Sequence, residues 1–201
     1  MALFAVAGLH FTLPPALQTG PSWLMLAVVS SLLLPITVSR LLGRMRLNQV
    51  LGYLLLVIVT ASMGWSLAQL VIALPAHLEA PVALFRSAAA LWITNILVFA
   101  SWYWRLDAGG PHARDQRSEH TEGAFLFAQM SLPPARKGGE GDRGWSPRFI
   151  DYLFLAFNTS TAFSPTDAAV LSRWAKLAMM VQALISMATV VLLAARAVNI
   201  L

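Results

Sequence analysis

Four long apolar blocks constrain this chain more than any other feature. They run from Ser22 to Ser39, from Leu47 to Leu74, from Val82 to Trp104 and from Leu177 to Ala195. A helix rises about 1.5 Å per residue, so about 20 apolar residues cover the roughly 30 Å hydrocarbon core of a bilayer. Only 11% of the residues are charged, which suits lipid as the surrounding solvent. We therefore predict an all-α membrane protein with four long transmembrane helices.

The N-terminal apolar segment, from Met1 to Leu13, is shorter and leaves two alternatives. As a helix it covers about 20 Å before Pro14 and Pro15 stop it. It is therefore either an interfacial helix or a short fifth transmembrane helix. A cleaved signal peptide fits poorly, because no Lys or Arg precedes the apolar run. We expect residues 1–17 to remain in the mature protein.

Basic residues in the loops predict the orientation. Arg40, Arg44 and Arg46 crowd the turn after the first long block, whereas the turn from Pro75 to Pro81 has no Lys or Arg. Cytoplasmic loops are enriched in these residues. We therefore predict that the first turn is cytoplasmic, and counting helices forward places the polar loop 105–148 on the same side.

Composition divides the chain into three regions. Residues 1–104 form an N-terminal transmembrane region, residues 105–144 a polar and mostly flexible cytoplasmic loop, and residues 145–201 a C-terminal module. The loop is rich in Gly, Pro and mixed charge, which disfavours a packed core. Its exception is Phe125 to Met130, where large apolar side chains predict a short interfacial or docking segment.

The segment from Ile150 to Asp167, IDYLFLAFNTSTAFSPTD, is the most informative part of the C-terminal module. Its helix-compatible residues end near Phe157, after only about 15 Å, so this helix stops partway through a membrane. Residues 158–161 can hydrogen-bond backbone groups of a non-helical turn. Ser-Pro-Thr-Asp at residues 164–167 then predicts the start of another helix. The pattern indicates a re-entrant, pore-loop-like half-helix before the last helix.

This order of outer helix, half-length aromatic helix, hydroxyl-rich turn and inner helix resembles the pore module of potassium channels and related tetrameric cation channels. The resemblance covers about Trp145 to Leu201, with the third long block as outer helix. The whole chain, with WYWRLDAGGP, FLFAQM, TAFSPTD and ARAVNIL, also looks like a bacterial family of integral membrane proteins of unknown function. These resemblances imply a multi-pass protein of the bacterial inner membrane. They also imply a homo-oligomer, with a tetramer favoured if it forms a pore.

The same resemblance aligns ten residues with the selectivity filter of those channels. Ser164 and Thr166 stand at the two filter glycines and Pro165 at the tyrosine, so a carbonyl-lined potassium filter is not expected. Rings of hydroxyls with Asp167 at the mouth would pass monovalent cations instead. The filter-like residues are Asn158, Thr159, Ser160, Thr161, Ala162, Phe163, Ser164, Pro165, Thr166 and Asp167.

Other interpretations of these residues stay open. The hydroxyls can simply satisfy a buried turn, and Asp167 can simply cap a helix. Our leading hypothesis is an oligomeric cation channel that is not selective for potassium. The alternatives are a non-conducting membrane scaffold or sensor with a channel-derived fold, and a small-solute transporter.

Polar residues inside the apolar blocks suit helix association. Gln69, Asn95 and Gln182 favour interhelical hydrogen bonds, and their alternative role is to line a water path. Trp102, Tyr103 and Trp104 end the third block and predict an interfacial aromatic belt.

The sequence nominates no enzyme site. It has no Cys, no nucleophile-elbow motif, and four histidines, His10, His77, His112 and His120, without metal-ligand spacing. We therefore expect no catalytic residue, no metal and no cofactor. The net charge of +5 lies mainly at block ends without a basic helix face, so lipid and not nucleic acid is the expected partner.

Because the chain has no Cys, Ser118→Cys introduces a single thiol into the polar loop. We expect a membrane-impermeant maleimide to label this variant in inverted vesicles and not in intact cells, because the loop is predicted to be cytoplasmic. The wild-type chain is the blank. Labelling in intact cells would contradict the predicted orientation.

Overall fold

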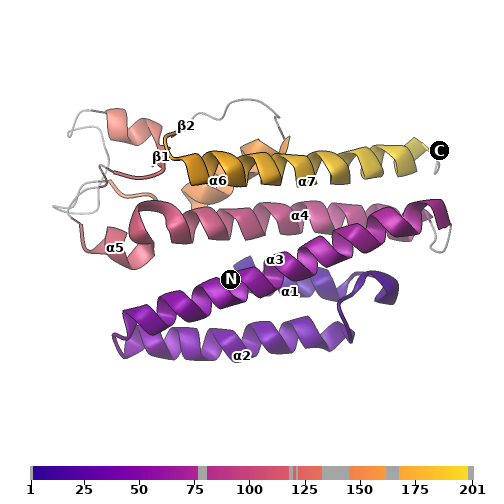
Figure 1. The fold of residues 1–201 in the computed structure, drawn as a ribbon, viewed down its shortest axis with the longest axis horizontal. Coiled ribbons are helices and arrows are strands. Elements are labelled where there is room, and N and C mark those ends of the chain that lie inside the picture. The colour runs from indigo at the N-terminus through magenta and orange to yellow at the C-terminus, as the bar shows by residue number, and fades with distance from the viewer. Residues whose placement is uncertain are drawn as a thin grey trace. The chain divides into compact units, whose positions relative to one another are not determined.

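Long helices dominate the fold (Figure 1), and the chain is mostly helical. The computed structural model describes residues 2–76, 81–117, 120, 122–132, 145–161 and 168–198. Within these residues, four helices are long and apolar enough to cross a membrane: α2 (Ser22–Leu41), α3 (Met45–Ala76), α4 (Pro81–Leu106) and α7 (Arg173–Val198). They confirm the four predicted blocks and indicate a multi-pass membrane protein.

Shorter elements precede and connect the long helices. They are α1 (Ala2–Phe11), the 3-10 helices η1 (Pro15–Leu17), η2 (Asp107–Gly109) and η3 (Ala128–Ser131), α5 (Pro111–Asp115), α6 (Phe149–Thr161), and strands β1 (Phe125–Leu126) and β2 (Ala169–Val170). The ten residues of α1 cover only about 15 Å, so this helix alone is too short to cross a bilayer. The antiparallel pairing of β1 with β2 is a small departure from the predicted all-α fold.

The chain forms two compact units. The first consists of Met1–Val98 with Ile185–Leu201, and the second of Phe99–Leu184. Helices α4 and α7 each contribute one part to the first unit and one part to the second.

In the first unit, α1, α2 and α3 pack around an aliphatic core with Val29, Leu55 and Leu56 at its centre. The turn between α2 and α3 needs Gly43, whose φ of +67° lies in the left-handed region. The first part of α4 and the last part of α7 are joined by Asn95, whose Nδ2 donates to Ser186 Oγ at 3.4 Å. This bond confirms the interhelical role predicted for Asn95.

In the second unit, α6 lies beside the N-terminal part of α7 (Figure 1). One face of α6 is buried, and it consists of Tyr152, Leu155, Ala156, Thr159 and Ser160. The opposite face exposes Ile150, Phe154 and Phe157. Because these positions recur at helical spacing, α6 has a packed polar and aromatic side and an uncovered apolar side.

Helix α6 extends further than the sequence suggested. Residues 158–161 form its last turn, so the predicted end near Phe157 is wrong. Thr159 Oγ1 donates to the Leu155 carbonyl at 2.8 Å, and Thr161 Oγ1 to the Phe157 carbonyl at 2.9 Å. Hydroxyls that bond to carbonyls of their own helix do not interrupt it, which explains the longer helix.

The last helix begins at Arg173. Ser172 caps it, since its Oγ accepts from the Ala175 N–H at 3.3 Å. The predicted helix start at residues 164–167 lies outside the described residues, but residues 168–171 form a bend and β2 and are not part of α7.

The described part of the predicted 105–144 loop is folded. Asp107 and Arg114 are buried, and they belong to η2 and α5, respectively. Phe125 and Phe127 are also buried, which confirms the docking segment predicted at Phe125 to Met130. Buried polar contacts order this Gly-rich stretch, and composition alone did not indicate them.

Candidate functional site

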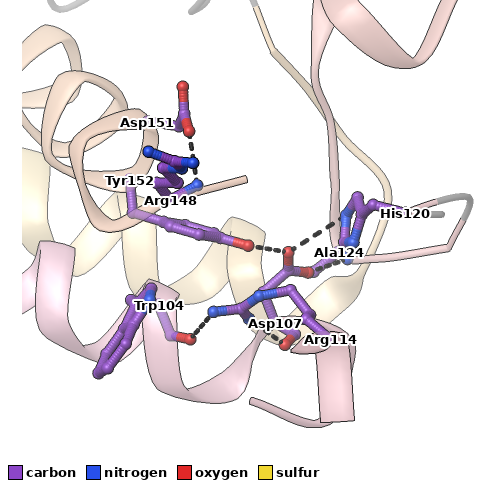
Figure 2. Close-up of polar contacts among 8 residues, drawn as sticks. All are labelled: Trp104, Asp107, Arg114, His120, Ala124, Arg148, Asp151 and Tyr152. Carbon is purple, nitrogen blue, oxygen red and sulfur yellow. Dashed lines mark hydrogen bonds and ion pairs between the residues drawn. The ribbon is translucent and has the colours of Figure 1, made fainter. Parts of the chain in front are cut away.

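A buried carboxylate, Asp107, lies where the end of α4, α6 and the segment before β1 meet (Figure 2). Asp107 is completely inaccessible to solvent. Oδ2 accepts a hydrogen bond from the Tyr152 hydroxyl at 2.5 Å, and Oδ1 accepts one from the Ala124 N–H at 2.5 Å. Hydrogen bonds to an ionised group are roughly twice as strong as neutral ones. Asp107 therefore ties α6 and β1 to the end of α4.

Arg114 supplies the positive charge of this cluster. Its Nη1 donates to the Asp107 carbonyl at 2.7 Å and its Nη2 to the Trp104 carbonyl at 2.8 Å (Figure 2). Carbonyls at a helix C-terminus lack partners within the helix and carry partial negative charge, so a guanidinium is favourable there. Its carbon Cζ also lies 5.1 Å from the centre of the Tyr152 ring, within cation–π range.

The chain reaches this geometry through a tight turn after α4. Ala108 has φ of +50°, and Gly110 has φ of +89°. A side chain at Gly110 would place its Cβ 2.9 Å from the Arg105 carbonyl oxygen, so only glycine fits. The turn brings α5 back toward α4 and thereby positions Arg114.

His120 is the second buried titratable group beside Asp107. Its Nε2 lies 3.8 Å from Asp107 Oδ2 (Figure 2). The His120 ring also stands edge to face with the ring of Trp145. Among the described residues, neither ring nitrogen has a hydrogen-bond partner. Burial lowers the pKa of His120, Asp107 raises it, and the positive charges of Arg114 and Arg117 lower it further, with a net lowering. The imidazole is therefore neutral at pH 7.

Tyr152 is held in its protonated form. Burial raises the pKa of its hydroxyl, and the Asp107 carboxylate raises it further. The phenol thus remains a hydrogen-bond donor to Asp107. Gly123 allows the strand segment to approach closely, because a Cβ there would lie 2.8 Å from Asp107 Oδ1 and 3.1 Å from His120 Nε2.

A second buried polar connection lies deeper along α6. The Tyr103 hydroxyl of α4 donates to Gln182 Oε1 of α7 at 2.6 Å. Gln182 Nε2 in turn donates to the Ala156 carbonyl at 2.7 Å and to Ser160 Oγ at 2.8 Å, both on α6. The interhelical role predicted for Gln182 is confirmed. Tyr103 is buried, so its placement in an interfacial belt was wrong.

An aromatic cluster surrounds these polar groups. Phe125 is fully buried, and its ring centre lies 5.2 Å from Tyr103, 6.2 Å from Tyr152 and 6.0 Å from Trp174. Tilted and edge-to-face pairs at these distances are favourable. Phe125 therefore docks the β1 segment against α4, α6 and α7 of the second unit.

The contacts also define the course of α6. It begins beside the end of α4, where the rings of Phe149 and Trp104 lie 6.0 Å apart. Near its other end, Ser160 contacts Gln182. Gln182 lies about 14 Å along α7 from Arg173, at a rise of 1.5 Å per residue. Ala169 is then paired with Leu126, next to Ala124 and Asp107. Phe149 and Ala169 thus both lie near the C-terminal end of α4 and the N-terminal end of α7.

The structure places four of the ten filter-like residues. Thr159 and Ser160 are buried and bonded within the chain, and Thr161 is exposed. Asn158 is half-buried and lines a cleft of about 180 Å³ together with Phe127, Gln129, Asp151 and Phe154, among others. The remaining six, Ala162, Phe163, Ser164, Pro165, Thr166 and Asp167, lie outside the described residues.

Sequence reasoning missed Asp107, Arg114, His120 and Tyr152 as a group. The available signal was an acidic residue directly after a long apolar helix, in WYWRLDAGGP. Such a residue normally lies in the headgroup region, and nothing local indicated that it is buried.

The cluster is suited to fix helices and to bind a proton. In the part of the chain that the structure describes, no three His, Asp or Glu side chains lie together as a metal site requires.

The chain matches no protein-family model, no curated protein and no solved structure.

Removal of one hydroxyl tests the importance of the Asp107 cluster. We expect Tyr152→Phe to lower the free energy of unfolding by about 1.5 to 3 kcal/mol, because a buried carboxylate loses a donor. Chemical unfolding in detergent micelles measures this free energy. Thr161→Val removes an exposed hydroxyl from the same helix, and we expect a loss below about 1 kcal/mol. Equal losses in the two variants would contradict a special role for Tyr152.

Proposed function

We propose that this chain is the subunit of an oligomeric membrane channel that passes small monovalent cations without potassium selectivity. One observation carries the proposal: a half-length helix, α6, is fixed by buried polar contacts between an outer helix, α4, and an inner helix, α7. This arrangement is the one that the potassium-channel resemblance implies for the C-terminal module.

The length and course of α6 support a re-entrant segment. Its 13 residues cover about 20 Å, which is less than the roughly 30 Å of a hydrocarbon core. α6 starts beside Asp107, and β2 pairs with β1 next to Ala124, which supports a segment that enters and leaves at one membrane face. The charge pattern assigns that face to the cytoplasm of a bacterial inner-membrane protein.

The end of α6 suits a cation path. A helix C-terminus carries a partial negative charge from its unpaired carbonyls, and a cation is favourable there. Residues 162–167 directly follow this end and include Asp167, a fixed negative charge. In a tetramer, four such carboxylates around an axis attract cations, while the absence of glycine at 164 and 166 removes the potassium filter.

Uncovered apolar faces support an oligomer. Only 17% of the membrane-length part of α7 is buried within the chain, and Ile150, Phe154 and Phe157 of α6 are exposed. In a membrane these faces meet lipid or another copy of the chain. A pore module needs several copies, because one re-entrant segment cannot enclose an ion path.

Cation flux in proteoliposomes tests this function. We expect wild-type protein to conduct and Asp167→Asn to lower the flux roughly tenfold, because the mouth loses its fixed charges. Asp115→Asn is the matched control, since it removes an exposed carboxylate from α5, and we expect its flux to equal that of the wild type.

The absence of flux above that of empty vesicles, under varied voltage and pH, would contradict the channel. It would favour the second candidate, a non-conducting scaffold or sensor. One observation already supports that candidate: Thr159 and Ser160 are bonded inside the chain, as a purely structural role requires. Saturable uptake coupled to an ion gradient would instead indicate a transporter.

A further inference from the structure

His120 has no function in the proposed pore, and its surroundings are unusual for a structural histidine. It is 2% exposed and, among the described residues, neither ring nitrogen has a hydrogen-bond partner. A buried polar side chain normally has a hydrogen-bond partner, and an unsatisfied one destabilises the folded state. Its backbone N–H donates to the Trp145 carbonyl at 3.4 Å, and its ring packs edge to face against the Trp145 ring, beside Asp107.

Four described groups determine what a proton on this ring would meet. The Asp107 carboxylate of η2 lies 3.8 Å from Nε2, and the Tyr152 hydroxyl of α6 shares the same oxygen, Oδ2. Arg114 of α5 and Arg117 after it oppose a further positive charge. The acceptor closest to a protonated imidazole is therefore one that Tyr152 already uses.

A proton on His120 adds a positive charge to a cluster that already holds Arg114 and Arg117. The charges of Asp107 and Arg114 offset one another, so an imidazolium leaves an unbalanced positive charge in a buried site. Gly123 lies against both side chains, because a Cβ there would be 2.8 Å from Asp107 Oδ1 and 3.1 Å from His120 Nε2. We therefore expect protonation either to draw Oδ2 toward His120 and away from Tyr152, or to expose His120 to water.

We propose that His120 is a proton-binding site that releases α6 from Asp107 when the pH falls. Both responses loosen the hydrogen bonds of Asp107 to Tyr152 and Ala124, and these bonds anchor α6 and β1. The ligand is a proton, and the site is the triad of His120, Asp107 and Tyr152. Only the consequence for ion flux rests on the proposed channel function.

The direction of the pH effect follows from the lowered pKa of His120. The pKa of His120 is lowered from 6.5 in the folded protein, so below about pH 6.5 the unfolded chain binds more protons. The contribution of His120 to stability is fully present above about pH 6.5. It is lost as the pH falls through the pKa that His120 has in the folded protein. Acid thus favours conformations in which His120 is exposed.

Hydrogen exchange of α6 tests the proposal in lipid nanodiscs at about pH 7.5 and about pH 5.5, after correction for the intrinsic chemical rate. We expect exchange of residues 149–161 to rise about threefold or more at the lower pH in the wild type. His120→Gln, which cannot titrate, should show no rise. His112→Gln removes a half-buried histidine of α5 and should behave as the wild type.

A second variant keeps the test decisive if His120→Gln fails to fold. Tyr152→Phe lacks the bond to Asp107, so its α6 should exchange fast at both pH values with no further acid response. A wild type without an acid response would overturn the proposal. So would a full acid response in His120→Gln, or one in Tyr152→Phe.

Flux measurements separate this proposal from the channel function. If the chain conducts, acid should lower the flux of the wild type and leave that of His120→Gln unchanged. An acid response of hydrogen exchange without flux at any pH would contradict the channel alone. Flux in a protein whose α6 ignores pH would contradict the proton site alone.

Discussion

Burial of the Asp107 carboxylate is the constraint on which the second unit depends. A charge removed from water is costly unless hydrogen bonds and an opposite charge compensate it. Here the donors come from Tyr152 and Ala124, and the charge comes from Arg114. Arg114, Ala124 and Tyr152 follow Asp107 by 7, 17 and 45 positions, so three separate segments must meet for the carboxylate to be tolerated. Hydrophobic burial alone could not select this one arrangement.

The remaining contacts of the unit follow from that anchor. With Tyr152 held at the end of α4, the other end of α6 reaches Gln182, which joins it to α7 and to Tyr103 of α4. The half-helix is thus fixed near both ends by polar contacts, which specify position more strictly than apolar packing. In the proposed channel this helix presents its C-terminus to the ion path, and at the proposed proton site its anchor lies beside His120.

The sequence predicted the long helices and missed the anchor, for physical reasons. A bilayer imposes a length, so α2, α3, α4 and α7 could be recognised by apolar length alone. Asp107 and Tyr152 are 45 positions apart, and no local pattern reports such a contact. The extent of α6 was misjudged because a Thr or Ser hydroxyl can satisfy a turn or its own helix with equal ease.

An experimental structure in lipid nanodiscs tests the central claim most directly. We predict a fourfold assembly in which the segment of residues 158–167 from each copy faces a common axis, with α7 as the inner helix and α4 as the outer one. A monomer would contradict it, as would a dimer with that segment at its periphery or an assembly whose axis is sealed by lipid.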